Sequence, residues 1–343
     1  VSSLDNHGED INSLVKLALD VLKNYDISPS AVTVVQSGNI KTVWKIRTDS
    51  ETLCLKRLKQ TYDKALFSVN AQVYIKNKGG NVPGIMLNIN NQPITIYDDQ
   101  LFVVYEWLSG RDLNFGISKD LELAVKGLAK FHMFSKGYNP IENSRTSSKL
   151  GKSPEQYASM KNKFEEWKAA AANNASAPRH STYLKYADSM IEIAGRAIEL
   201  INKSSYDSLT GPGSDSVVLC HQDYGKGNAL MTGNGIYVLD LDGVTYDLPA
   251  RDLRKVIGKQ AEDRNRWSIE LINEVTDWYT QINPMDEKEK HVLYIDLLFP
   301  HWFFGLVKNI YKSNKAVKPA KIEMICKLEQ DKVPILDSLL RCM

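Results

Sequence analysis

Two short motifs, separated by nine residues, place the strongest constraint on this chain of 343 residues. The first covers residues 220–228 (CHQDYGKGN), and the second covers residues 238–243 (VLDLDG). Apolar residues lead into each motif, and glycine-containing turns separate them, so we expect two short strands that each end in a loop. Polar side chains at such strand ends are available for chemistry, whereas the strands before them belong to the core.

The spacing of these polar residues fits the transfer of a γ-phosphoryl group. That reaction needs one carboxylate near the accepting hydroxyl group and oxygen ligands that hold Mg²⁺ against the nucleotide phosphates. Asp223 fits the role of catalytic base, and Asn228 and Asp240 fit the role of metal ligands in an H-x-D-x-x-x-x-N pattern. Asp242 lies two residues after Asp240, so on a strand both side chains would point to one face and could share the metal. The alternative, ordinary loop carboxylates, is disfavoured because both motifs occur in order.

Composition indicates a globular protein with a large core. The chain is 43% hydrophobic and 24% charged, and its 343 residues are enough for two domains. Its net charge of +2 gives no bulk attraction to nucleic acid or to anionic membranes. No run approaches the 18 apolar residues of a membrane span, and no leader precedes the first helix, so we expect synthesis in the cytosol. The four cysteines are far apart, without a C-x-x-C pair, and we expect reduced thiols.

The first hundred residues are expected to form a small antiparallel sheet with two helices. Alternating or continuous apolar runs predict strands, and spaced apolar positions predict helices. The expected strands cover residues 31–35, 42–48, 52–58, 87–97 and 101–107, and the expected helices cover residues 13–24 and 63–76.

Three features of this sheet are candidate nucleotide contacts. Lys56 lies on the third strand, where kinase-like folds place the lysine that contacts the α and β phosphates. Ser37, Gly38 and Asn39 connect the first two strands and would either cover the phosphates or form a plain hairpin turn. Glu106 ends the last strand, either at a hinge whose backbone groups bind an adenine or in a simple edge strand.

The remainder of the chain is expected to be mainly helical. Spaced apolar positions predict helices over residues 120–135, 154–173, 180–202, 252–264, 267–280, 287–312 and 319–340. We therefore predict an α+β protein of kinase-like, two-lobe organisation. Residues 1–105 would form the small β-rich nucleotide-binding lobe, and residues 106–343 the larger helical lobe with the catalytic loop.

Taken together, these motifs resemble the aminoglycoside phosphotransferase and choline kinase superfamily. Further stretches are similar to the CotS-type spore coat proteins of endospore-forming bacteria, closest to the I and S members. The resemblance covers nearly the whole chain, and the stretches that carry it are residues 64–67 (KALF), 80–85 (GNVPGI), 220–225, 239–249 (LDLDGVTYDLP), 251–255 (RDLRK) and 298–301 (LFPH). It implies synthesis in the mother cell, deposition on the spore surface, contacts with other coat proteins and binding of ATP with Mg²⁺.

Two departures from the kinase pattern affect the expected activity. Kinase-like folds place a Glu on the helix after the lysine strand, but here the only acidic residue between Gln60 and Gly80 is Asp63, and Gln72 is the expected occupant. A neutral amide removes the charge-assisted pair with Lys56. A long activation segment is also absent after Asp240, so a small-molecule hydroxyl is a better acceptor than a peptide.

Several further residues have two interpretations each. By the resemblance, Asp252 braces the catalytic loop, although a carboxylate at a helix N-terminus is favourable in any case. His132 is expected to be a buried structural histidine, and His221 to hold the loop. The aromatic segment at residues 299–304 (FPHWFF) would either line an acceptor pocket or pack in the core.

Three classes of function remain open from sequence alone. The chain is an active ATP- and Mg²⁺-dependent small-molecule phosphotransferase, a nucleotide-binding coat protein without activity, or a purely structural coat component. Retention of Asp223, Asn228, Asp240 and Asp242 argues against the third class.

Overall fold

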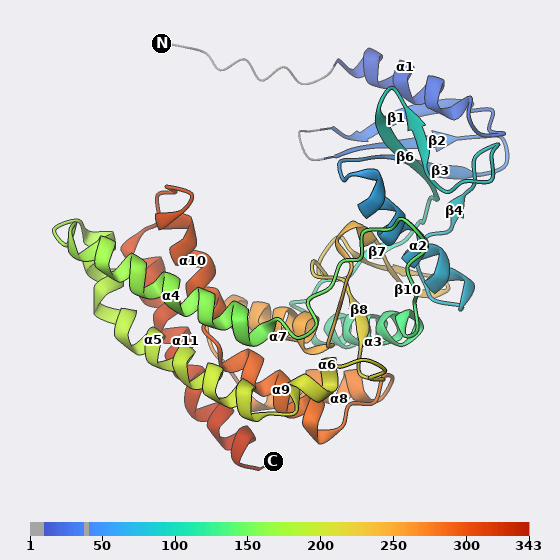
Figure 1. The fold of residues 1–343 in the computed structure, drawn as a ribbon. Coiled ribbons are helices and arrows are strands. Elements are labelled where there is room, and N and C mark those ends of the chain that lie inside the picture. The colour runs from blue at the N-terminus through green and yellow to red at the C-terminus, as the bar shows by residue number, and fades with distance from the viewer. Residues whose placement is uncertain (1–9, 38–40, 343) are drawn as a thin grey trace, which may run out of the picture. The chain divides into compact units, whose positions relative to one another are not determined.

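The computed structural model describes residues 10–37 and 41–342, which form two compact units. Each unit is assembled from several segments of the chain (Figure 1). The first unit contains Val1–Leu113, Gly137–Ser147 and Gly227–Val244, and the second contains Asn114–Lys136, Ser148–Lys226 and Thr245–Met343. The boundary between residues 105 and 106 that the sequence indicates stays a prediction.

A twisted antiparallel sheet forms the centre of the first unit. Its strand order is β1-β2-β3-β6-β4, and β5 also pairs with β6. The strands are β1 (Ala31–Gln36), β2 (Thr42–Arg47), β3 (Thr52–Leu58), β4 (Ile85–Met86), β5 (Thr95–Tyr97) and β6 (Gln100–Glu106). The single strand predicted over residues 87–97 is wrong. β4 ends at Met86, β5 begins at Thr95, and the chain between them turns at Asn91, which has a positive φ of 57°.

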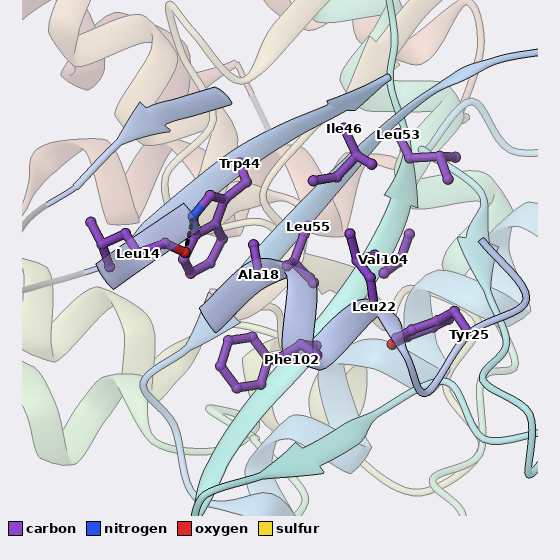
Figure 2. Packing of buried hydrophobic residues seen from close by; sticks show 11 residues of the cluster. Leu14, Ala18, Leu22, Tyr25, Trp44, Ile46, Leu53, Leu55, Phe102 and Val104 are labelled. Carbon is purple, nitrogen blue, oxygen red and sulfur yellow. Dashed lines mark hydrogen bonds between the residues drawn. The ribbon is translucent and has the colours of Figure 1, made fainter. Parts of the chain in front are cut away.

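One face of this sheet is covered by helix α1 (Ile11–Leu22). Figure 2 shows the apolar side chains of the helix packed on those of β2, β3 and β6. Trp44 is fully buried here, and its indole N–H donates a hydrogen bond of 3.0 Å to the carbonyl oxygen of Leu14. The helix and the sheet are thus joined by one polar contact within an apolar interface.

The opposite face of the sheet packs against helix α2 (Tyr62–Asn77). Because side chains alternate along a strand, Leu53 and Leu55 of β3 face α1, whereas Leu58 belongs to the cluster on the α2 side. The same alternation places Lys56 on the α2 side. A basic side chain therefore lies among buried residues, where its charge needs a partner.

The rest of the first unit carries the second motif. Strand β9 (Ala229–Thr232) pairs with β7 (Arg111–Asp112) and with β10 (Gly235–Val238), which confirms the strand predicted before Asp240. The 3₁₀ turn η1 (Leu241–Gly243) follows directly. The motif is therefore attached to the first unit through this small sheet.

Helices dominate the second unit, as the apolar periodicity predicts. A two-stranded sheet of β8 (Val218–Cys220) and β11 (Thr245–Asp247) holds the first motif. The helices are α3 (Ser118–Ser135), α4 (Ser153–Ala172), α5 (Pro178–Lys203), α6 (Tyr206–Thr210), α7 (Ala250–Arg264), α8 (Ile269–Thr280), α9 (Glu287–Leu298), α10 (His301–Tyr311) and α11 (Pro319–Arg341). Among the described residues, no helix is long and apolar enough to cross a membrane. All four cysteines are free thiols, as predicted.

The single helix predicted over residues 287–312 is wrong, because the chain breaks it at Phe299 and Pro300. Proline has no backbone N–H and cannot continue the ladder of α9. Glu329 of α11 then accepts the backbone N–H groups of Trp302 and Phe303 at 2.9 and 3.0 Å, which satisfies the first turn of α10. The break reorients the aromatic segment, so that Phe303 is fully buried whereas Trp302 is only partly so.

The Trp44 contact gives a stability prediction. Trp44→Phe removes the indole donor to the Leu14 carbonyl oxygen, which keeps only its partner within the helix, and it removes buried indole volume, so it should lower the free energy of unfolding by about 2–3 kcal/mol in urea titrations. Leu19→Ala, on the same helix at a side chain that is 42% exposed, should cost less than about 1 kcal/mol. Equal losses in the two variants would contradict this role of Trp44.

Candidate functional site

Lys56 is the centre of the candidate site in the first unit. It is only 6% exposed, and its ammonium group lies 2.7 Å from Asp240 Oδ1 and 2.6 Å from Asp242 Oδ2. The two carboxylates of the second motif thus converge on the lysine of β3, which is 184 residues earlier in the chain than Asp240. The structure brings together three of the residues that sequence reasoning selected.

The backbone at these aspartates differs from the expected strand. Asp240 adopts a left-handed conformation with φ 62° and ψ 63°, and Asp242 lies in the 3₁₀ turn η1. The alternation of a strand is therefore the wrong reason for their shared direction. A left-handed residue is uncommon outside glycine, although Asp tolerates it better than most residues do. Here the turn itself aims both carboxylates at Lys56.

Sequence reasoning missed a second lysine at this site. The ammonium group of Lys41, just before β2, lies 2.8 Å from Asp240 Oδ2. Each oxygen of the Asp240 carboxylate therefore has its own lysine. The only signal in the sequence was that Lys41 follows shortly after Ser37, Gly38 and Asn39, which were expected either to cover the phosphates or to form a plain hairpin turn.

These contacts shift the acid–base equilibria of the site. Burial by itself raises the pKa of Asp240, but the positive charges of Lys56 and Lys41 outweigh it and lower the pKa to about 2. Burial lowers the pKa of Lys56, whereas Asp242 and Asp240 outweigh that effect and raise it. Lys56 and Asp240 are thus held in their charged forms.

A cavity of about 260 Å³ adjoins this cluster within the first unit. Lys41, Lys56 and Asp240 line its charged end. The remaining lining is mostly apolar and comes from β2, β3, the end of β6 and the β9–β10 sheet, with Val43, Cys54, Tyr105, Leu108, Leu230 and Leu239. A ligand with an apolar ring and an anionic tail would match this division of the cavity.

Glu106 lines the same cavity, but its carboxylate and its backbone N–H already form hydrogen bonds within the protein. Its carboxylate accepts from the backbone N–H of Gly84 at 3.1 Å and from Lys76 at 3.2 Å. Its own backbone N–H donates to the Gly84 carbonyl oxygen at 2.8 Å. The predicted role of Glu106 at an adenine therefore stays a prediction.

Gln72, the expected replacement for the missing helix Glu, also lines this cavity. Its side-chain amide is directed elsewhere, because Nε2 donates to the carbonyl oxygen of Pro83 at 2.7 Å. The idea that Gln72 holds Lys56 in position is wrong, since the two aspartates do so.

The other predicted nucleotide and metal residues of the first unit are less defined. Ser37 is exposed at the end of β1, and Gly38 and Asn39 lie outside the described residues. Asn228 is half-buried, and its carbonyl oxygen accepts the backbone N–H of Leu239 at 3.0 Å, which ties the first motif to the residue before Asp240.

The loop of the first motif that includes Asp223 belongs to the second unit. Asp223 is exposed, and its backbone N–H donates to Nδ1 of His221 at 3.2 Å. The preceding residue, Gln222, has a positive φ of 68°, which is strained for a non-glycine residue. Such a conformation persists only where the surrounding structure fixes it.

Asp252 of α7 supplies that constraint. Its fully buried carboxylate accepts the backbone N–H groups of His221 and Gln222 at 2.5 and 2.9 Å. It also bonds His132 Nε2 at 3.1 Å, and the other ring nitrogen of His132 bonds the Tyr279 hydroxyl at 2.8 Å. The predictions that Asp252 braces the loop and that His132 is structural agree with this network. His132, Cys220 and Asp252 also form a group compact enough for a metal, but hydrogen bonds already engage their ligand atoms.

Lys255, one turn after Asp252, is a second residue that sequence reasoning missed. Its ammonium group donates to the carbonyl oxygen of Gln222. Burial lowers the pKa of Lys255, and the carboxylates of Asp252 and Asp223 act in the opposite direction. The loop that carries Asp223 is thus held from α7 through both its N–H and its C=O groups.

Comparison with known proteins identifies the family. Residues 20–333 match the family described as "Spore coat putative kinase YutH", and the chain belongs to it. It is 24% identical over 329 residues to spore coat protein S of Bacillus subtilis strain 168, which covers 94% of both chains. The resemblance to spore coat proteins is confirmed.

The fold is that of small-molecule kinases. An aminoglycoside phosphotransferase from Alicyclobacillus acidocaldarius superposes with a TM-score of 0.77 at 15% identity, covering 95% of this chain and 96% of that one. An amicoumacin kinase in complex with AMP-PNP, Ca²⁺ and Ami gives a TM-score of 0.63 at 15% identity, covering 96% and 97%. The predicted kinase-like α+β fold, with an antiparallel sheet followed by a helical region, is confirmed.

The Asp240 pair gives a pH-dependent prediction. Because the folded state lowers the pKa of Asp240 from 3.8 to about 2, its contribution of about 2 kcal/mol is complete above pH 5 and is lost as the pH falls through 2. In urea unfolding, wild type should exceed Asp240→Asn at pH 6, and the two curves of free energy against pH should converge toward pH 2. Asn90→Ala is the control, because it changes an exposed residue that does not titrate, and its curve of unfolding free energy against pH should be parallel to that of wild type. A curve for Asp240→Asn that is parallel to wild type would contradict the lowered pKa of Asp240.

Proposed function

We propose that this protein binds ATP with Mg²⁺ in the cavity of the first unit and transfers the γ-phosphoryl group to a hydroxyl group of a small molecule. The observation that carries the proposal is the convergence of Lys56, Asp240 and Asp242 at the charged end of that cavity. The fold supports it, because an amicoumacin kinase of similar fold is known in complex with AMP-PNP and Ca²⁺.

The division of the cavity suggests how the nucleotide would lie. The purine would occupy the apolar part beside Tyr105 and Leu108, with Glu106 at its edge. The phosphates would lie at the charged end, where Lys56 and Lys41 are the cations. Ser37, Gly38 and Asn39 would cover the phosphates from the turn after β1.

The residues present fit a Mg²⁺ ion. Asp240, Asp242 and Asn228 offer hard oxygen ligands, and the two carboxylates already converge on one cation, the Lys56 ammonium. When bound, Mg²⁺ would neutralise charge on the phosphates. The chain's part is to orient these carboxylates and to release Lys41 and Lys56 toward the nucleotide.

Asp223 would act as the base in the transfer. The acceptor hydroxyl group gives its proton to the Asp223 carboxylate, and its oxygen forms a bond to the γ-phosphorus of ATP. The bond between that phosphorus and the β–γ bridging oxygen breaks, and the products are ADP and the phosphorylated acceptor. Asp252 and Lys255 keep the loop in place while Asp223 remains exposed to the acceptor.

We further propose that the protein is made in the mother cell and acts in the spore coat, together with other coat proteins. Membership of the spore coat family and the full-length similarity to spore coat protein S support this location.

A nucleotide-binding coat protein without turnover is the second candidate. It is favoured by α2, which lacks a Glu opposite Lys56 and turns its Gln72 amide to Pro83 instead. Without that pair, the two aspartates are competitors of the nucleotide for Lys56, which would slow or prevent the reaction.

Nucleotide binding should be visible as stabilisation. ATP with Mg²⁺ at about a hundred times its dissociation constant should add roughly 2.7 kcal/mol to the free energy of unfolding, which raises Tm by several degrees. Lys41→Met and Lys56→Met should each weaken ATP binding at least tenfold and AMP binding less, since AMP has only one of the phosphates that these lysines would contact. Lys59→Met, at an exposed lysine outside the cavity, is the matched control. No change in Tm at millimolar ATP with Mg²⁺ or Mn²⁺ would refute binding.

Asp223→Asn should separate binding from chemistry. The dissociation constant of ATP should change less than twofold, whereas release of ADP should fall by about 10²–10⁴ because the base is lost. Calorimetry and a coupled ADP assay on preparations purified side by side would measure the two quantities. Wild-type turnover in Asp223→Asn would exclude Asp223 as the base, and ATP binding without any turnover in the wild type would favour the second candidate.

A further inference from the structure

We propose that a second cavity, lined by α7, α10 and α11 of the second unit, is the acceptor site and that it takes an anionic sugar, a sugar phosphate or sugar acid. This inference rests on the proposed function, because it names the class of molecule that would accept the phosphoryl group. The cavity has a volume of about 460 Å³, which suits a molecule of that size. All of its lining residues belong to the second unit.

Positive charge dominates the polar side of this cavity. Arg254, Lys255 and Lys321 line it, and Glu262 is the one carboxylate among the lining residues. Glu262 is already engaged, at 2.9 Å from Lys321 and 3.5 Å from Lys259.

Two carboxylates offset only part of this charge, because Glu262 pairs with Lys321 and Asp296 pairs with Arg254, whereas Lys255 is a third cation of the lining. Burial lowers the pKa of His301, and the charge of Arg254 lowers it further, so the imidazole is neutral at physiological pH. Arg254 donates through Nε to Asp296 at 2.8 Å, and among the described residues its terminal guanidinium nitrogens have no further partner. Cations with donors to spare favour a phosphate or carboxylate ligand.

The opposite wall is apolar and is built rigidly. Trp302 lies against Gly258 of α7 so closely that a Cβ atom at position 258 would be 1.8 Å from the indole. The indole also meets Trp267 edge-on at 6.3 Å, and Glu329 fixes the backbone N–H of Trp302. An aromatic side chain positioned on three sides offers a flat apolar contact surface at little cost in side-chain entropy.

The two walls together suit a sugar ring. A pyranose presents a C–H face that matches the indole of Trp302, and hydroxyl groups at its rim that match the Asn309 amide and the lysines. This resolves the two interpretations of the aromatic segment, because Phe299 and Phe303 are fully buried in the core whereas His301 and Trp302 line the cavity.

Lys255 connects this cavity to the loop that carries the proposed base. It lines the cavity, and its ammonium group donates to the carbonyl oxygen of Gln222, the neighbour of Asp223. A polycationic acceptor is disfavoured, since it would bring ammonium groups against Lys255, Lys321 and Arg254.

Direct binding to the full chain without nucleotide tests the inference. Calorimetric titrations would use glucose 6-phosphate, glucuronate, glucose and glucosamine. We expect one or both anions to bind at least tenfold more tightly than glucose, and glucosamine not to bind. The phosphate and carboxylate arms identify which anion the site accepts.

Two variants and a matched control connect this binding to the cavity. Lys321→Gln and Asn309→Asp, which change the charge of the lining, should each weaken anion binding at least tenfold. Lys327→Gln is the control, because Lys327 lies on the same helix, forms a comparable exposed pair with Glu323 at 3.3 Å and does not line the cavity. Thermal melts of all three would establish that they fold.

The outcomes separate this inference from the proposed function. Equal affinity for glucose and the anions, preference for glucosamine, or unchanged anion binding in folded Lys321→Gln and Asn309→Asp would overturn the acceptor class. ATP binding without any anion binding would overturn this inference alone. Anion binding that depends on Lys321, in a protein that fails to bind ATP, would leave the anion site standing and overturn the phosphotransferase.

Discussion

The buried ammonium group of Lys56 determines how the first unit is assembled. Strand alternation forces this side chain to the α2 side of the sheet, where it is only 6% exposed. A buried charge without a partner would cost several kcal/mol, and the sheet itself provides no carboxylate for it. The partners come from residues 240 and 242, so Gly227–Val244 folds with the first unit although the residues on both sides of it belong to the second. These ion pairs and the β7–β9–β10 sheet together hold this segment in the first unit.

In the second unit, a buried carboxylate holds the loop that carries Asp223. Asp252 accepts two successive backbone N–H groups of the catalytic loop and bonds His132, while Lys255 holds the Gln222 carbonyl oxygen. Together these bonds sustain a left-handed backbone at Gln222 that would cost about 1–3 kcal/mol on its own. The strain is local to the residue before Asp223, where it sets the direction in which the loop presents its side chains.

The sequence was sufficient to predict the structure where the periodicity of apolar residues or the spacing of motifs determines it. The strands β1, β2, β3 and β6 and most helices follow from apolar periodicity. Motif order indicates that Lys56 and Asp240 belong to one site, but it does not predict the ion pair between them. The sequence was insufficient where the backbone conformation of a single residue determines the direction of the chain. Neither the left-handed Asp240 nor the break at Pro300 has a periodic signal, and both depend on partners far away in the chain.

Residues that reach a site only through tertiary contacts could not be predicted from the sequence. Lys41 and Lys255 resemble ordinary exposed lysines in sequence, and only folding brings Lys41 to Asp240 and Lys255 to the catalytic loop. Gln72 illustrates the reverse error, because its spacing on α2 was correct for a partner of Lys56 and its amide nevertheless bonds Pro83. Spacing along a helix specifies which face a residue occupies, but hydrogen-bonding partners are chosen by the whole environment.

Charge balance at the first-unit cavity connects the two ligands proposed for it. Lys41 and Lys56 are neutralised by Asp240 and Asp242, so a nucleotide that draws the lysines to its phosphates would leave two carboxylates without partners. A divalent cation supplies the missing partner, and by itself it would instead compete with the lysines for the same oxygens. Each ligand therefore removes the cost that the other would meet alone, and linkage requires that this coupling be equal in both directions. On this view, the internal ion pairs disfavour binding of free ATP and of the free metal, and they make the site selective for the two together.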